Sequence, residues 1–132
     1  MNIPKKIMIV DDDPSQIYTI KTLFEYSDEK ENYEVLPANS GEECLDLLSN
    51  NQIPDLILLD IMMPGMNGMV VLEKIKENPS WRHIPIAFLT ATSAHNVKER
   101  GRNLGDDFIQ KPIEADNFLE RIKKLTQPNQ TN

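Results

Sequence analysis

The sequence contains little cysteine and few aromatic residues, with one cysteine and 6% aromatics in 132 residues. A lone cysteine, Cys44, cannot form a disulfide within the chain. Cys44 lies in a helical apolar pattern with no histidine or second cysteine near it, so we expect it to fill space in the core. With 39% apolar and 27% charged residues, the composition is that of a soluble chain that packs a core.

Long apolar runs are also missing. The longest lie around Ile7–Val10, Leu56–Leu59 and Ile84–Leu89, and all fall far short of the roughly 20 residues that cross a bilayer. The segment Met1–Lys6 has neither the apolar core nor the cleavage site of a signal peptide. We therefore expect a cytoplasmic protein without a membrane partner.

Positive charge is scarce, because 14 lysine and arginine residues are set against 21 aspartate and glutamate residues. The resulting net charge of -7 disfavours binding to a phosphate backbone, which depends on lysine and arginine. We expect no direct nucleic-acid partner.

Short apolar runs alternate along the chain with longer stretches of helical periodicity. This alternation is typical of repeated βα units around a parallel sheet. We predict an α/β fold with a five-stranded, doubly wound parallel sheet. The length suits one domain, expected over residues 1–126, with a polar tail at 127–132.

The individual elements can be placed from their patterns. Strands are expected at Lys6–Val10, Tyr33–Ala38, Asp55–Asp60, Ile84–Leu89 and Asp107–Gln110. Helices are expected after the Asp13 cap and Pro14, after a capping box of Ser40 and Glu43, from Val70 to before Pro79, and over Ala94–Asn103 and Ala115–Leu125. The charged segment Ser27–Asn32 is expected to be a loop.

Polar side chains stand at the carboxyl ends of the predicted strands, where open parallel sheets bind ligands. Asp11 and Asp12 follow the first strand, Asp60 ends the third, Thr90 follows the fourth and Lys111 follows the fifth. Repulsion between clustered carboxylates has to be offset by a cation or by Lys111. Carboxylates without a nearby histidine or cysteine suit Mg²⁺ (or Mn²⁺), and a hydroxyl with an ammonium suits a phosphoryl group. The set predicts phosphoryl transfer to Asp60.

One known family matches four segments jointly: Ile7–Asp13, Asp55–Gly68, Ile86–Ala91 and Asp106–Pro112. From about Lys6 to Leu125 the chain resembles the receiver domains of two-component response regulators, including the chemotaxis receivers. The resemblance implies a flavodoxin-like fold with strand order 2-1-3-4-5.

The resemblance also implies a role for each matched site residue. Asp60 is expected to be the nucleophile that takes a phosphoryl group from a phosphohistidine or a small phosphodonor. Asp11 and Asp12 are expected to bind Mg²⁺ together with the Asp60 carboxylate and the Met62 backbone carbonyl. Lys111 is expected to contact the phosphoryl oxygens.

A conformational switch made of Thr90 and Phe108 follows from the same resemblance. Thr90 is expected to hydrogen-bond to the phosphoryl group and Phe108 to move with it, which would change a surface on the fourth helix, fifth strand and fifth helix. Phe108 stands where many members have tyrosine, so no phenol hydroxyl is available. A cis peptide bond between Lys111 and Pro112 is also implied.

The family's partners would be a sensor histidine kinase or phosphotransfer protein as donor and an unidentified downstream protein as target. The chain would be a monomer or a phosphorylation-dependent dimer. It would catalyse only its own aspartyl phosphorylation and dephosphorylation, so we do not expect a conventional enzyme.

Three alternatives stand beside this interpretation. A receiver-like adaptor could signal by binding alone, without phosphorylation. A Mg²⁺-dependent phosphatase is disfavoured because such enzymes usually carry an aspartate two residues after the nucleophile, where this chain has Met62. A flavodoxin-like cofactor binder is disfavoured because Asp11, Asp12 and Asp13 would repel a phosphate.

Overall fold

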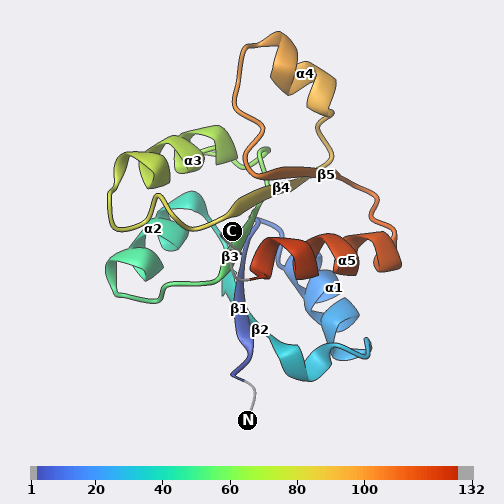
Figure 1. Cartoon of the computed structure of the whole chain (residues 1–132). Coiled ribbons are helices and arrows are strands. Elements are labelled where there is room, and N and C mark those ends of the chain that lie inside the picture. The colour runs from blue at the N-terminus through green and yellow to red at the C-terminus, as the bar shows by residue number, and fades with distance from the viewer. Residues whose placement is uncertain (1–2, 128–132) are drawn as a thin grey trace, which may run out of the picture.

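Parallel strands form one sheet in the computed structural model, which describes residues 3–127. The strands are β1 (Lys5–Val10), β2 (Tyr33–Ala38), β3 (Leu56–Leu59), β4 (Ile86–Thr90) and β5 (Asp107–Gln110). All are parallel and lie in the order β2-β1-β3-β4-β5, as predicted (Figure 1). Strand β3 is central, and the less apolar β2 lies at an edge.

Helices cover both faces of the sheet. They are α1 (Pro14–Glu25), α2 (Gly41–Ser49), α3 (Gly68–Glu77), α4 (Ala94–Glu99) and α5 (Ala115–Thr126), with a short 3-10 helix, η1, at Lys30–Asn32. Helices α1 and α5 lie on one face and α2 and α3 on the other, while α4 projects beyond the sheet at the top of the view (Figure 1). Within residues 3–127, no helix has both the length and the apolar character needed to cross a membrane.

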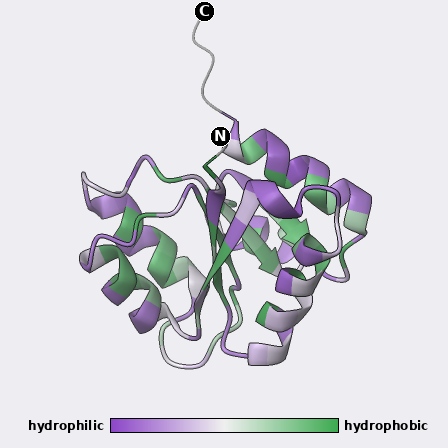
Figure 2. Ribbon diagram, turned by 90° about the horizontal axis from the view of Figure 1, so that it is seen from below, coloured by the Kyte–Doolittle hydropathy of each residue, from purple (hydrophilic) through white to green (hydrophobic). Residues whose placement is uncertain are grey.

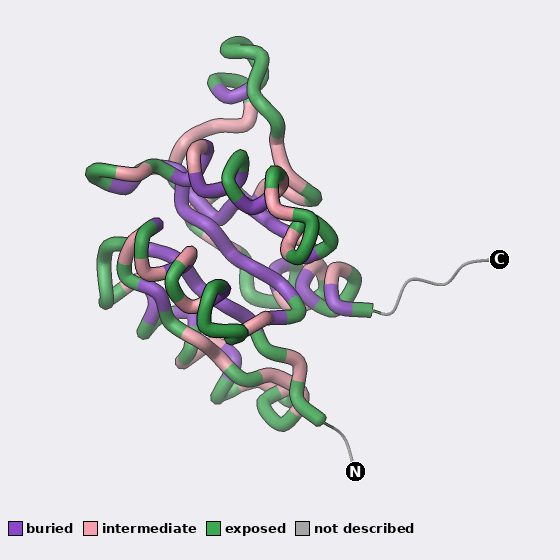
Figure 3. The backbone as a smooth tube through the Cα atoms, turned by 90° about the vertical axis from the view of Figure 1, so that its left-hand side faces the viewer, coloured by how far each residue is buried: buried purple, intermediate pink, exposed green. Residues whose placement is uncertain are grey.

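Two apolar layers hold these helices on the sheet. On β1, Ile7 and Ile9 face the layer under α1 and α5, while Met8 and Val10 face the layer under α2 and α3. Strands β3 and β4 are buried along their whole length and β1 over Ile7–Val10, whereas the edge strands β2 and β5 are mostly half-exposed and the outer helix faces are exposed (Figure 3). Apolar residues accordingly concentrate in the sheet and on the inner helix faces (Figure 2). A strand buried on both faces reads as a continuous apolar run, which explains the pattern of Leu56–Leu59.

Side-chain caps fix where the helices begin. The Asp13 carboxylate accepts a hydrogen bond from the Ser15 backbone N–H and so caps α1, as predicted. The Ser40 hydroxyl accepts from the Glu43 N–H at the start of α2. Since each cap follows a strand end closely, it also fixes the loop in which the polar residues stand.

Several predicted boundaries were wrong, including the start of α3, which is Gly68 instead of Val70, and the bounds of β3, which are Leu56–Leu59 instead of Asp55–Asp60. Strand β4 begins at Ile86, because the N–H of Ile84 donates to the Trp81 carbonyl in a turn. Helix α4 ends at Glu99 instead of Asn103, because Gly101 adopts a φ of 67° and closes the helix. The segment expected to be a loop contains η1. Helix α5 runs one residue further, to Thr126, and residues 128–132 of the predicted tail lie outside the described part of the chain.

Candidate phosphoryl-transfer and metal site

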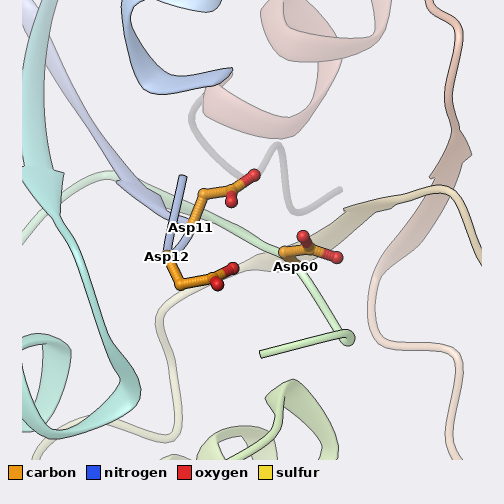
Figure 4. Close-up of side chains that lie close together, drawn as sticks. All are labelled: Asp11, Asp12 and Asp60. Carbon is orange, nitrogen blue, oxygen red and sulfur yellow. The ribbon is translucent and has the colours of Figure 1, made fainter. Parts of the chain in front are cut away.

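Carboxylates from two neighbouring strand ends meet at one edge of the sheet. Asp11 and Asp12 follow β1 and Asp60 follows β3, and these strands pair directly. One oxygen from each of the three side chains lies within 4.8 Å of the others. Figure 4 shows the three carboxylates side by side. The predicted acidic cluster is therefore present.

Lys111 supplies the positive charge nearest to this cluster. Its Nζ lies 3.0 Å from Asp11 Oδ2 and 4.0 Å from Asp60 Oδ2. The other Asp11 oxygen accepts a hydrogen bond from the Asp13 N–H at 3.0 Å. The Asp11 side chain is only 6% exposed, so its interaction with the ammonium is poorly screened by water. Lys111 offsets the carboxylate repulsion as the sequence pattern required.

The backbone around Asp60 holds its carboxylate in place. The Asp60 N–H donates to the Val10 carbonyl at 3.0 Å, and Asp60 Oδ1 accepts from the Met62 N–H at 3.1 Å. Burial raises the pKa of the Asp60 carboxyl, while the nearby Thr90 hydroxyl, the Met62 N–H and the Lys111 ammonium oppose that rise. The remaining oxygen, Oδ2, lies on the side of Lys111.

Thr90 lies at the end of β4 and is fully buried. Its hydroxyl accepts a hydrogen bond from the Thr92 N–H at 3.3 Å, and its carbonyl accepts one from the Lys111 N–H at 2.8 Å. The peptide bond between Lys111 and Pro112 is cis, as the resemblance implied. These contacts join the ends of β4 and β5.

Phe108 lies on β5 and is half-buried. Its ring packs on Phe88 with centroids 6.0 Å apart, and its carbonyl accepts a hydrogen bond from Arg121. Arg121 also binds both carboxylate oxygens of Asp107, which ties β5 to α5.

Gly68, the first residue of α3, has a specific role beside the site. A Cβ atom at Gly68 would collide with the Asp60 carbonyl oxygen and would lie 2.8 Å from Ile61 Cα. Only glycine lets the start of α3 approach the Asp60 backbone this closely. A glycine at the first position of the helix was the available signal in the sequence, but its contact with Asp60 is a tertiary feature that the pattern did not predict.

The donor set fits a hard cation. It consists of carboxylate oxygens, without histidine or cysteine, and the negative charge of this cluster is only partly neutralised by one lysine. Mg²⁺ and Mn²⁺ prefer such ligands and take one or two carboxylates with water. The Met62 side chain is 66% exposed, and its N–H is used by Asp60, so only its carbonyl could serve as a ligand.

Comparison with known proteins gives a consistent result. Residues 7–123 match the model of the response regulator receiver domain. The polar-differentiation response regulator DivK of Brucella anthropi is 37% identical over 122 residues, covering 92% of this chain and 95% of DivK. The response regulator PleD of Caulobacter vibrioides is also 37% identical over 122 residues, but the chain spans only 26% of PleD.

A solved structure shows the same fold. The signal receiver domain of a signal transduction histidine kinase from Syntrophus aciditrophicus superposes with a TM-score of 0.79 at 32% identity. The match covers 92% of this chain and 89% of that one.

Proposed function

We propose that this chain, which belongs to the response regulator receiver family, accepts a phosphoryl group on Asp60 in a two-component signalling pathway. The observation that carries the proposal is the position of Asp60, a largely buried carboxylate beside Asp11 and Asp12 and 4.0 Å from the Lys111 ammonium. The family consists of signalling modules, and we propose that this chain is likewise not a conventional enzyme. We assign residues 1–126 to the receiver domain and place the protein in the cytoplasm.

Asp11, Asp12 and Asp60 would hold Mg²⁺ or Mn²⁺, with the Met62 carbonyl as a further ligand. The metal would neutralise negative charge on the incoming phosphoryl oxygens. Without such a cation the cluster would repel a phosphoryl donor, since the Lys111 ammonium is the one positive group within 4 Å of these carboxylates in the described chain. We therefore propose that phosphorylation depends on the metal.

The reaction is transfer from a phosphohistidine of a sensor kinase or phosphotransfer protein, or from a small acyl phosphate. An Asp60 carboxylate oxygen attacks phosphorus, and the bond from phosphorus to the donor atom breaks. Asp60 Oδ1 is held by the Met62 N–H, which leaves Oδ2 as the better placed nucleophile. Lys111 Nζ, 4.0 Å from Oδ2, is close enough to turn from Asp11 to the new phosphoryl oxygens.

The signal would arise because Thr90 and Lys111 gain a new anionic partner. The Thr90 hydroxyl accepts a long hydrogen bond of 3.3 Å from the Thr92 N–H, and its own O–H, which lies near Asp60, can donate to a phosphoryl oxygen on that residue. Moving Thr90 inward would pull on the loop before α4 and free space for Phe108, which packs on Phe88 of the same strand as Thr90. We propose that α4, β5 and α5 then present an altered surface to a downstream protein.

Incubation with Mg²⁺ and acetyl phosphate, followed by intact mass measurement, tests the proposal. We expect the wild type to gain one phosphoryl group and Asp60→Asn to gain none. Asp55→Asn is a matched control, because Asp55 is exposed before β3 and should leave the gain intact. If the wild type bound Mg²⁺ but gained no phosphoryl group, the proposal would fail and an adaptor that acts by binding alone would replace it.

A further inference from the structure

A hollow of about 680 Å³ lies between the loop after β3, the start of α3 and the inner side of α4. It exists because α4 is short and stands away from the sheet (Figure 1). This volume is within the range of sites that bind ligands or large anchoring side chains. The hollow, here called the α3–α4 groove, adjoins the carboxylate site, since Met62 and Thr92 line it and their N–H groups donate to Asp60 and Thr90. Asp60, Thr90 and Lys111 themselves are not among its lining residues.

The floor of the α3–α4 groove is apolar and adaptable. Ile61, Met63 and Met69 line it from the β3–α3 side, and Val97 closes it from α4. Methionine side chains are flexible and polarisable, so a surface that contains them can adjust to different apolar partners. The floor therefore suits bulky apolar side chains, not a small polar ligand.

The rim of the groove is positive, although the whole chain has a net charge of -7. Arg100 and Arg102 are among the lining residues and no aspartate or glutamate is. Arg102 already contacts Glu73 at 3.0 Å, whereas Arg100 is exposed and makes no ion pair within residues 3–127. A partner of complementary charge would place a carboxylate at Arg100.

The surrounding elements also restrict the partner's conformation. Strand β4 is paired on both sides, by β3 and β5, so the groove offers no strand edge to an extended peptide. Its walls are a helix on one side and a helix with its preceding loop on the other. An apolar trough of this kind accepts the apolar face of an amphipathic helix.

We propose that the α3–α4 groove binds an amphipathic helix of a partner protein, with large apolar side chains in the groove and acidic side chains at Arg100. Apolar burial supplies most of the affinity, and the arginine selects partners with an acidic flank. The binding does not require phosphorylation of Asp60.

The probe is a labelled synthetic helical peptide with leucine and phenylalanine at i, i+3, i+4 and i+7 and glutamate at the remaining positions. Fluorescence anisotropy should show binding to the full chain at concentrations below roughly 1 mM. The peptide should bind equally well with and without Mg²⁺ and acetyl phosphate. The same peptide with lysine in place of glutamate should bind at least roughly fivefold more weakly, a loss expected from a few exposed charge pairs.

Variants locate the site. Val70→Glu puts a carboxylate in the groove wall at the start of α3, where helices tolerate glutamate, and should weaken binding at least tenfold, on the order of one buried anchor. Arg100→Glu should weaken it roughly fivefold. Lys98→Glu makes the same charge change on α4 outside the lining residues and should have little effect. Thermal unfolding of each variant checks that the fold is kept.

Amide and methyl NMR shifts add an independent location, and we expect them at Met63, Val70 and Val97. The proposal would be overturned if the wild type did not bind the peptide, or if Val70→Glu bound it as tightly as the wild type. It would equally be overturned if the lysine peptide bound as tightly as the glutamate peptide, or if the shifts were confined to α5.

Discussion

Two regions at the carboxyl end of the sheet are built differently: the ends of β1 and β3, and the segment between β4 and β5. Asp11 and Asp60 follow strands that are buried on both faces, and their backbone N–H groups donate to Ala38 and Val10. The α4 segment, residues 91–106 between β4 and β5, has one helix of six residues in which only Val97 is buried. Figure 3 shows the contrast between buried strands and the exposed α4 segment.

This difference indicates how the molecule can combine a fixed site at Asp60 with a surface that changes. The proposed metal ligands and the proposed nucleophile have to keep their positions, and the buried strands β1 and β3 provide that stability. A segment with few buried contacts can move at little energetic cost, so it is the part that a new charge on Asp60 can displace. The predictions below test this division, in order of decreasing effect.

The largest expected difference is between Leu58→Ala and Val97→Ala. Leu58 is 1% exposed in β3, and its truncation should lower the free energy of unfolding by about 2–5 kcal/mol. Val97→Ala should cost no more than about 1.5 kcal/mol, because it removes two methyl groups from a segment that contributes little to global stability. Urea denaturation measures both, and equal losses would show that the α4 segment is as firmly built as β3.

The next largest difference is expected between alanine substitutions at two glycines, Gly68 beside the site and Gly101 after α4. Gly68→Ala forces a methyl group against the backbone of Asp60 and Ile61, which should destabilise the fold by about 1–3 kcal/mol and slow phosphorylation at least roughly tenfold. Gly101→Ala has open space around it but a φ of 67°, so it should cost about 1 kcal/mol and leave phosphorylation unchanged. The rate of phosphorylation by acetyl phosphate distinguishes the two variants. A normal rate for Gly68→Ala would show that Gly68 does not position Asp60.

A smaller effect depends on pH and concerns Cys44 in α2, on the well-packed side. Burial raises the pKa of the Cys44 thiol from 9.0 to about 12, so the unfolded chain loses this proton first as the pH rises. The thiol's contribution to stability is thus complete below pH 9 and falls as the pH rises towards 12, so that about 1.4 kcal/mol of it is lost by pH 10. Cys44→Ala should lack this part of the alkaline loss in urea titrations; an identical pH dependence would mean that water reaches the thiol.

The smallest effect concerns the competition of Lys111 with the metal. Removing the ammonium in Lys111→Met frees Asp11 and Asp60 for a cation, so the affinity for Mg²⁺ should rise roughly fivefold. Calorimetric titration measures this, with Lys124→Met as a control that removes the same charge from the exposed side of α5. Weaker binding of Mg²⁺ by Lys111→Met would show that the lysine orders the carboxylates instead of competing for them.

The parts of the molecule that local patterns determine were predictable. Buried strands leave continuous apolar runs in the sequence. Because parallel strands end at one edge of a sheet, the sequence predicted that Asp11, Asp12 and Asp60 lie close together. The Asp13 cap followed from side-chain chemistry in the same way.

What depends on contacts between distant residues was not predictable. The end of α4 was misplaced because a helical pattern continued through Gly101, whose positive φ is a property of the folded turn. The α3–α4 groove left no signal in the sequence, since it exists only through the placement of α4 relative to α3. The close approach of Gly68 to Asp60 is likewise a tertiary contact.

Hydrogen exchange with and without beryllium fluoride and Mg²⁺, which together mimic an acyl phosphate, tests the central claim that the proposed acyl phosphate on Asp60 moves the α4 segment. We predict altered exchange in residues 91–110, unchanged exchange in Ile7–Val10 and Leu56–Leu59, and no response in Asp60→Asn. A response spread evenly over both regions, or one that persists in Asp60→Asn, would contradict a fixed carboxylate site that acts on a movable α4 segment.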